Sequence, residues 1–217
     1  IAVDQAKHIS EARGEIRRVI EIMEASCTIP SLIQGEMLDG IAPNINGRVV
    51  KQSLGVFGGV APFNFPALVF AWFVPYAIGA GNTFIYKPST QSPLFMQKMG
   101  DIFNQIGLPK GVVNIIHGNR SIPGTWYEHD KMSGVCLVGS TPTAKKMAEA
   151  CGRGGKRSML LGGAKNYLVA MEDVNWDVFI ENFINSGYGS AGQRCLAGSI
   201  VAAVPEVYDE LIERVLE

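Results

Sequence analysis

Hydrophobic and polar positions follow two different periods along this chain. Near the N-terminus apolar residues recur every three or four positions among charges, and Ile16, Val19 and Met23 fall on one face. This spacing predicts an amphipathic helix within residues 1–30. Residues 31–53 are polar and interrupted by glycine and proline, as in a connecting strand or arm.

From residue 54 onward, short apolar runs alternate with helical patterns. Strands are expected over 54–61, 82–86, 112–117, 134–138 and 158–161, with helices between them. Strands that are apolar throughout are typical of a parallel sheet buried on both faces. The fold class expected is therefore α/β, with a doubly wound, Rossmann-like parallel sheet.

The Gly162-Gly163 pair ends this alternation and predicts a domain boundary. Beyond it we expect two further strands, over 167–171 and 199–204. Between them we expect a helix that Asn175 caps, with Phe179, Phe183 and Ile184 facing a core.

Three parts follow from this layout. We expect residues 1–53 to form an N-terminal helix and arm, residues 54–162 the doubly wound domain, and residues 163–217 the start of a second, incomplete α/β domain. The sequence begins without methionine inside one helical pattern and stops inside another, so we expect a piece of a longer protein.

Composition excludes several classes of function. The chain has 47% hydrophobic and 18% charged residues, enough for a folded core, and its net charge of -1 gives no reason to expect nucleic acid or an anionic membrane as partner. Neither a signal peptide nor a run long enough to cross a bilayer is found. Its four cysteines and three histidines lack metal-site or disulfide spacing, so no metal is expected. We expect a protein of the cytoplasm, or of the mitochondrial matrix if the source is eukaryotic.

The stretch Gly192-Gln193-Arg194-Cys195 holds the first candidate for catalysis. A thiol on a turn, among backbone N–H groups and next to a cation, has the surroundings of a thiolate nucleophile. The alternative is that Cys195 is a small buried hydrophobe, as most single cysteines are.

Two segments could hold phosphates or a ribose, although the expected parallel sheet of residues 54–161 contains no G-x-G-x-x-G. Gly139-Ser140-Thr141 turns from a strand into a helix, whose N-terminus attracts anions. An ordinary capped helix is the alternative. Lys87 ends another strand at the sheet edge where ligands bind, and the alternative is a surface lysine.

Asn64 lies in the most unusual stretch, between two phenylalanines and two prolines at a strand-to-helix turn. A rigid amide donor is what an oxyanion hole requires. A plain turn residue is the alternative, because asparagine is common in turns.

Six motifs together resemble the aldehyde dehydrogenase superfamily in their order and approximate spacing, over nearly the whole chain. They are APFNFP, GNTFIYKPS, GLPKGVVNIIHG, VGST, LGGAKN and GSAGQRC. LGGAKN and AGQRC are most similar to the CoA-acylating methylmalonate-semialdehyde dehydrogenase branch, which includes malonate-semialdehyde enzymes.

The resemblance implies that residues 54–162 are a dinucleotide-binding domain and that residues 163–217 are the incomplete start of an α/β catalytic domain. It also implies a role for each matching residue. Cys195 is the implied nucleophile, and Asn64 the implied oxyanion donor together with the Cys195 N–H. The remaining positions are implied to bind NAD: Ala61, Pro62 and Phe63 line the cofactor, Lys87 with Ser89 and Thr90 lies at the adenosine ribose, Gly139 and Ser140 at the pyrophosphate, and Gly162 near the nicotinamide. Thr90 replaces the family's usual acidic residue, which keeps NADP as an alternative.

The implied reaction oxidises a semialdehyde through a cysteine thioester. Leu160 stands where hydrolytic relatives have their general base, which favours coenzyme A over water as the acyl acceptor. Arg194 and Arg18 are the implied partners of the substrate carboxylate, with a solvated helix face as the alternative for Arg18 and its neighbour Arg17.

Two other hypotheses remain open: a hydrolytic, succinate-type semialdehyde dehydrogenase, and a catalytically incomplete cofactor-binding fragment. A cysteine acyltransferase is disfavoured because no histidine is placed to pair with Cys195. The full-length protein is expected to be a homodimer or homotetramer.

Overall fold

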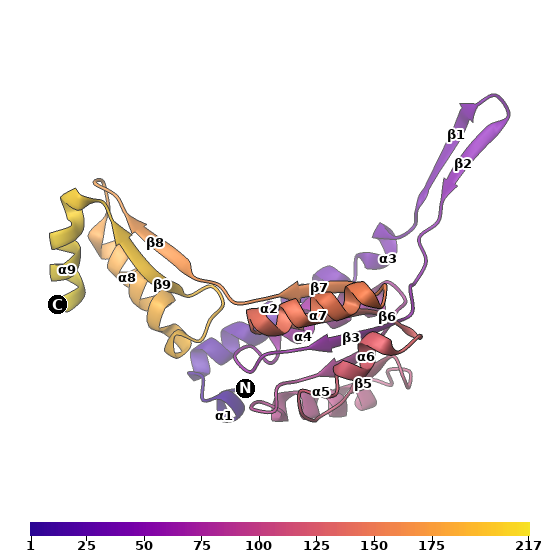
Figure 1. The fold of residues 1–217 in the computed structure, drawn as a ribbon, viewed down its shortest axis with the longest axis horizontal. Helices are drawn as coiled ribbons and strands as arrows, with labels where there is room; N and C mark the ends of the chain where they lie inside the picture. The colour runs from indigo at the N-terminus through magenta and orange to yellow at the C-terminus, as the bar shows by residue number, and fades with distance from the viewer. The chain divides into compact units, whose positions relative to one another are not determined.

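The computed structural model describes all of residues 1–217 and divides into two compact units, Ile1–Gly162 and Gly163–Glu217. The first unit contains α1 (Ala2–Gln5), α2 (Ile9–Ser26), α3 (Ile29–Leu32), β1 (Glu36–Ala42), β2 (Ile45–Val49), β3 (Val56–Val60), α4 (Leu68–Gly79), β4 (Thr83–Lys87), α5 (Leu94–Gln105), β5 (Val113–Ile115), α6 (Gly124–Glu128), β6 (Met132–Val138), α7 (Thr141–Arg153) and β7 (Arg157–Leu161). The second contains β8 (Asn166–Ala170), α8 (Trp176–Tyr188), the short 3-10 helices Gly189–Gly192 and Pro205–Val207, β9 (Gly198–Ala203) and α9 (Tyr208–Leu216). Figure 1 labels these helices and strands.

A five-stranded parallel sheet organises the first unit. Its strand order is β5-β4-β3-β6-β7, so the chain moves outward from β3 on one side and then crosses to the other side at β6. This confirms the predicted doubly wound, Rossmann-like parallel sheet.

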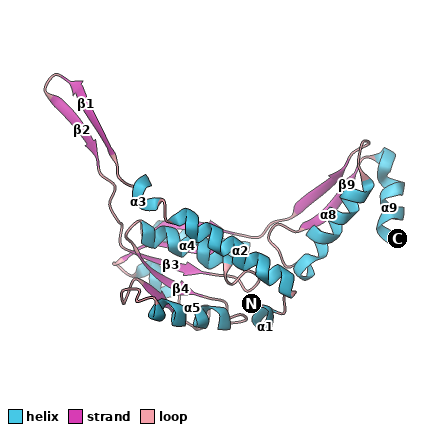
Figure 2. Ribbon diagram, turned by 180° about the vertical axis from the view of Figure 1, so that it is seen from behind, coloured by secondary structure: helices cyan, strands magenta, loops and turns pink.

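Helices cover both faces of this sheet, and they appear from opposite sides in Figures 1 and 2. One face packs against α4 and α5, and the other packs against α6 and α7. Helix α2 forms an outer layer, where Val19 packs on Ala67 and Ala71 at the start of α4. Since α4 is buried between the sheet and α2, its sequence is apolar on every side.

The sequence of β6 explains how one strand serves two cores. Cys136 and Val138 join the cluster under α4 and α5, whereas Val135 and Leu137 join the cluster under α6 and α7. Successive side chains of a strand point to opposite faces, so a central strand covered on both sides carries consecutive apolar residues, as residues 135–138 do.

The N-terminal region differs from the single helix predicted within residues 1–30. It forms three helices, with a break between α1 and α2 at Ala6, whose φ of 58° is left-handed. The expected connecting strand over 31–53 is an antiparallel hairpin of β1 and β2, in which Ala42 pairs with Ile45 across a turn that contains Asn44 at φ 61°. Asparagine tolerates this conformation better than most residues. The pattern of hydrophobic positions does not indicate the conformation of a single turn residue, so the hairpin was not predicted.

In the second unit, β8 and β9 pair in parallel and the helix between them begins as predicted. The Asn175 side chain accepts a hydrogen bond from the Val178 N–H at 3.3 Å. The expectation that Phe179, Phe183 and Ile184 all face a core is wrong for Ile184, which is 53% exposed. Within the 217 residues, no residue of α8 is buried, and β8 and β9 are the strands of its unit.

No helix in either unit combines the length and the apolar character that a membrane span needs.

Candidate functional site

Four strands of the large sheet end at one edge, beside the cofactor-binding residues predicted from sequence. Val60 pairs with Lys87, and the Ala61 N–H donates to the Lys87 carbonyl at 3.1 Å. On the other side of β3, Val138 pairs with Leu161, and the neighbouring Gly139 N–H donates to the Leu161 carbonyl at 3.0 Å. The segments that follow β3, β4, β6 and β7 therefore lie side by side.

This edge includes the topological switch point of the sheet. The chain leaves β3 for β4 and β5, then returns beside β3 as β6. In open α/β sheets, ligands bind in the crevice outside the carboxyl ends of the strands at this point. Residues 61–64 leave β3 there, and Gly139-Ser140 leaves β6.

Lys87 is buried at this edge, with 5% of its surface exposed, so the surface-lysine alternative is wrong. Its Nζ donates to the Pro88 carbonyl at 3.0 Å, and burial lowers the pKa of its ammonium. The next residues form a tight turn, in which the Ser89 hydroxyl accepts from the Gln91 N–H at 3.2 Å, and Thr90 is exposed.

Ser140 occupies the N-cap position of α7 but does not cap it with its side chain. Its Oγ lies 2.9 Å from the hydroxyl of Thr143. A capping side chain accepts from the second or third N–H of the helix, and here the second residue is Pro142, which has none. The ordinary capped helix given as the alternative is therefore not formed by the Ser140 side chain, while the predicted turn and helix start are present.

Gly162 permits a close approach between the end of β7 and the start of α7. A Cβ at this position would lie 2.9 Å from the Thr141 Oγ1 and 3.3 Å from its Cα. A larger residue would displace the helix that begins the predicted pyrophosphate site.

The Asn64 loop is held by two residues to which the sequence analysis gave no role, Lys7 and Glu15. Lys7 Nζ donates to the backbone carbonyl of Asn64 at 2.7 Å. Glu15 accepts from the backbone N–H of Ala67 at 2.9 Å. The sequence contains one indication that Glu15 has a buried partner, because this carboxylate lies on the apolar face of a helix, between Ala12 and Val19.

Cys195 belongs to the second unit, where an asparagine holds its backbone. Asn166 Nδ2 donates to the carbonyl of Cys195 at 2.8 Å and to that of Ala197 at 3.0 Å. The chain reaches the cysteine through left-handed residues, with φ of 52° at Ser190 and 55° at Ala191. Such conformations are unfavourable for residues with a Cβ and concentrate at functional turns. The thiol is partly exposed, which does not fit the buried-hydrophobe alternative.

The two arginines assigned to a substrate carboxylate have protein partners in this structure. Arg194 donates from Nη1 to the Asn185 carbonyl in the last turn of α8 at 3.2 Å. Its guanidinium also lies against Gly189, where a Cβ would come within 2.6 Å of Nη2. Arg18 forms an exposed ion pair with Glu21 at 2.5 Å, as the solvated-face alternative predicts.

The structure thus brings together the predicted cofactor residues of the first unit. Leu160, which the resemblance aligns with the general base of hydrolytic relatives, packs against the cluster beneath α6 and α7. Nowhere do three or more histidine, cysteine or acidic side chains gather in a way that could hold a metal ion.

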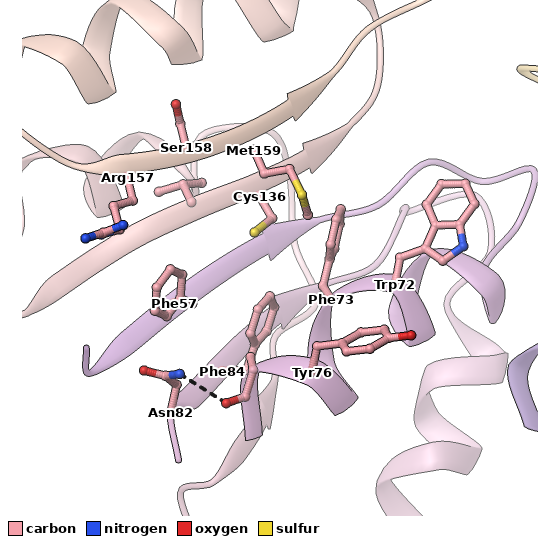
Figure 3. A pocket seen from close by; sticks show the side chains of 12 residues that line it. Phe57, Trp72, Phe73, Tyr76, Asn82, Phe84, Cys136, Arg157, Ser158 and Met159 are labelled. Carbon is pink, nitrogen blue, oxygen red and sulfur yellow. Dashed lines mark hydrogen bonds between the residues drawn. The ribbon is translucent and has the colours of Figure 1, made fainter. Parts of the chain in front are cut away.

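A pocket of about 420 Å³ lies on the α4 side of the sheet, away from this edge. Figure 3 shows Phe57, Phe73, Phe84 and Met159 around it, with Asn82 bound to a backbone carbonyl. Its sheet residues come from the beginnings and middles of the strands, and none of the residues predicted to bind cofactor lines it. The pocket is therefore separate from the candidate site.

Comparisons with known proteins agree on one family. The aldehyde dehydrogenase family model matches residues 1–217. A malonate-semialdehyde dehydrogenase of Geobacillus kaustophilus is 40% identical over 217 residues, which are 100% of this chain and 45% of that protein. The chain thus spans less than half the length of this curated relative.

Solved structures give the same result. A methylmalonate-semialdehyde dehydrogenase of Oceanimonas doudoroffii matches with a TM-score of 0.92 and 35% identity, covering 95% of this chain and 42% of that one. A structure from Sinorhizobium meliloti, assigned to a methylmalonate-semialdehyde dehydrogenase and complexed with NAD, matches with a TM-score of 0.93 and 35% identity over 97% of this chain and 43% of that one. The predicted resemblance is confirmed, and the chain belongs to the aldehyde dehydrogenase family.

Proposed function

We propose that the protein containing this chain oxidises a short, carboxylated semialdehyde, malonate or methylmalonate semialdehyde, with NAD and coenzyme A. The observation that carries this proposal is the gathering of residues 61–64, Lys87, Gly139-Ser140 and Gly162 at one edge of a parallel sheet. The names of the relatives support the substrate class.

The residues at this edge fit a dinucleotide. Lys87 is a buried cation whose Nζ is held at the end of β4, where it can bind a ribose hydroxyl. The N-terminus of α7 favours a pyrophosphate, because its N–H groups and dipole attract negative charge. Gly162 lets the end of β7 lie close to the start of α7, since a Cβ there would come within 2.9 Å of Thr141 Oγ1. When bound, NAD accepts the hydride that the substrate loses.

In the proposed reaction, the Cys195 thiolate adds to the aldehyde carbon and the carbonyl oxygen becomes an alkoxide. The Asn64 amide and the Cys195 N–H donate hydrogen bonds to that oxygen, which stabilises the developing charge. Loss of hydride from the same carbon leaves a thioester on Cys195. Asn166 holds the Cys195 carbonyl and so fixes the orientation of this peptide.

The thioester is then resolved by transfer to a thiol. Leu160 offers no general base to activate water, and it packs into the core beneath α6 and α7. A thiol such as coenzyme A needs less base assistance than water does. Attack of the CoA thiolate on the thioester carbonyl releases the Cys195 thiolate and forms an acyl-CoA.

Arg194 and Arg18 are the proposed carboxylate partners. A guanidinium binds a carboxylate through two parallel hydrogen bonds. Arg194 would exchange its contact with the Asn185 carbonyl for the substrate, and Arg18 would exchange its contact with Glu21.

The assembly and location of the whole protein belong to the same proposal. We propose a homodimer or homotetramer in the cytoplasm, or in the mitochondrial matrix of a eukaryote. Because the chain spans 45% of its curated relative, we expect the 217 residues alone to lack turnover.

The test is steady-state kinetics of the whole protein with malonate, methylmalonate and succinate semialdehydes, with NAD or NADP, and with or without CoA. We expect continuous NADH formation only when CoA is present, and a single burst without it. Equal turnover without CoA would support the hydrolytic alternative. Cys195→Ala is the control and should abolish both phases.

A further inference from the structure

Lys7 and Glu15 form an ion pair inside the first unit. Lys7 Nζ lies 2.7 Å from Glu15 Oε2, and the two side chains are 2% and 0% exposed. By contrast, the Lys98–Asp101 pair on α5 is 81% and 55% exposed. A buried ion pair often contributes less to stability than apolar residues of the same volume would, because both charges lose their hydration. Its presence here points to a role beyond stability.

Lys7 binds the turn that contains Asn64. Its Nζ donates to the Asn64 carbonyl at 2.7 Å and lies 3.9 Å from the centroid of the Phe65 ring. Lys7 follows Ala6, whose left-handed φ of 58° breaks the chain between α1 and α2. This break ends α1 and places Lys7 just ahead of α2, rather than within one continuous helix.

Glu15 binds the other end of the same loop. Its Oε1 accepts from the backbone N–H of Ala67 at 2.9 Å and of Leu68 at 3.1 Å. These groups begin α4, which has no capping side chain of its own. A carboxylate at a helix N-terminus satisfies unpaired N–H groups and interacts favourably with the helix dipole. Glu15 of α2 thus caps α4 from a distant part of the sequence.

The two residues together fix both ends of residues 64–68. An oxyanion donor works only when it is already in place as charge develops, because any reorganisation then raises the barrier. We propose that Lys7 and Glu15 are positioning residues that hold Asn64 in its productive orientation. This inference rests on the proposed role of Asn64. Both side chains are buried, so the proposal assigns neither of them a contact with the substrate.

The first test is the double variant Lys7→Met/Glu15→Leu in the whole protein. It replaces the ion pair with apolar groups of similar volume but leaves the Asn64 carbonyl and the N–H groups of Ala67 and Leu68 without these partners, so the thermal unfolding midpoint should fall. The single-turnover NADH burst should slow by about 10- to 100-fold, since small misplacements of a reacting group have effects of that size. The dissociation constant for NAD should change by less than about 3-fold, because binding at the sheet edge does not require Asn64.

A double-mutant cycle with Asn64→Ala separates positioning from general destabilisation. Asn64→Ala alone should slow the burst about 100- to 1000-fold, as loss of an oxyanion donor does. If Lys7 and Glu15 act through Asn64, replacing them in the Asn64→Ala background should slow the burst no further. A general structural role would give the same fold-loss in both backgrounds.

Lys98→Met/Asp101→Leu is the matched control, because it removes an exposed ion pair of the same unit, and its burst should be unchanged.

Glu15→Gln is measured in the same cycle. This variant keeps an oxygen acceptor for the N–H groups of α4 while it removes the charge. It can therefore be tested if the double variant does not fold. A normal burst in the folded Lys7→Met/Glu15→Leu protein, with the expected loss in Asn64→Ala, would overturn the positioning role alone. A normal burst in Asn64→Ala would instead overturn the proposed function.

Discussion

Asn166, at the start of β8, donates from its side-chain amide to the backbone carbonyl of Cys195 at 2.8 Å. The same nitrogen donates to the Ala197 carbonyl at 3.0 Å. Removal of this amide leaves two partly buried carbonyls without that donor, at a cost of about 1–3 kcal/mol. We therefore expect Asn166→Ala to lower the free energy of unfolding by this amount and to slow thioester formation.

Unfolding in urea and the NADH burst measure these two effects. Asn182→Ala is a suitable control, because Asn182 donates to the Val178 carbonyl on the exposed surface of α8. A variant Asn166→Ala with the stability and burst rate of the native protein would show that the amide does not order the cysteine segment.

Gly162→Ala should weaken the start of α7. Its Cβ would lie 2.9 Å from Thr141 Oγ1, so β7 and α7 would have to separate by a few tenths of an ångström. We expect a loss of about 1–3 kcal/mol of stability, typical of overpacking, and weaker NAD binding. Calorimetry and NAD titration measure both quantities.

Gly152→Ala is the matched control within α7, where a Cβ would meet nothing within 4 Å. Alanine in a helix interior is favoured over glycine by about 0.5–1 kcal/mol, so this variant should be slightly more stable than the native protein. If Gly162→Ala behaves in the same way, the close approach to Thr141 does not limit this position.

The four cysteines should divide into two pairs by reactivity. Cys27 is exposed and Cys195 is partly exposed, whereas Cys136 and Cys151 are buried. Burial raises the pKa of the Cys136 thiol to about 11 and also raises the pKa of Cys151. At pH 8, a disulfide reagent should therefore modify Cys27 and Cys195 quickly, and the other two only after unfolding. Rapid modification of Cys136 or Cys151 in the folded protein would contradict this.

Cys136 should also make stability depend on pH in alkaline solution. Its folded-state pKa of about 11 lies above the ordinary value of 9.0, mainly because burial disfavours the thiolate. The contribution of Cys136 to the free energy of unfolding is fully present below pH 9. About 2 kcal/mol is lost as the pH rises toward 11.

Urea unfolding at several pH values between 8 and 11 measures this slope. Cys136→Ala should flatten it, whereas Cys27→Ala, at an exposed position, should leave it unchanged. If the free energy of unfolding of Cys136→Ala depends on pH as strongly as that of the native protein, other groups cause the pH dependence.

Local sequence patterns were sufficient for the strands of the large sheet, for β8 and β9, and for most of the helices, but they did not separate β1 from β2. The alternating core of β6 and the wholly apolar α4 predicted a sheet covered on both faces. The pattern did not reveal the break at Ala6 or the turn at Asn44, because a single left-handed residue leaves no periodic trace. Ile184 was assigned to a core on periodicity alone, although the small second unit leaves it exposed.

Residue types and their local order were enough to predict the family, the doubly wound sheet and the candidate chemistry of Cys195, Asn64 and Lys87. The folded structure was needed to see that Lys87 is buried, that Ser140 does not cap α7, and that Arg194 contacts the end of α8. It also joined Lys7 and Glu15 to the Asn64 loop, about 50 positions away. Contacts of this kind depend on how helices pack across layers, and no spacing along the chain encodes them directly.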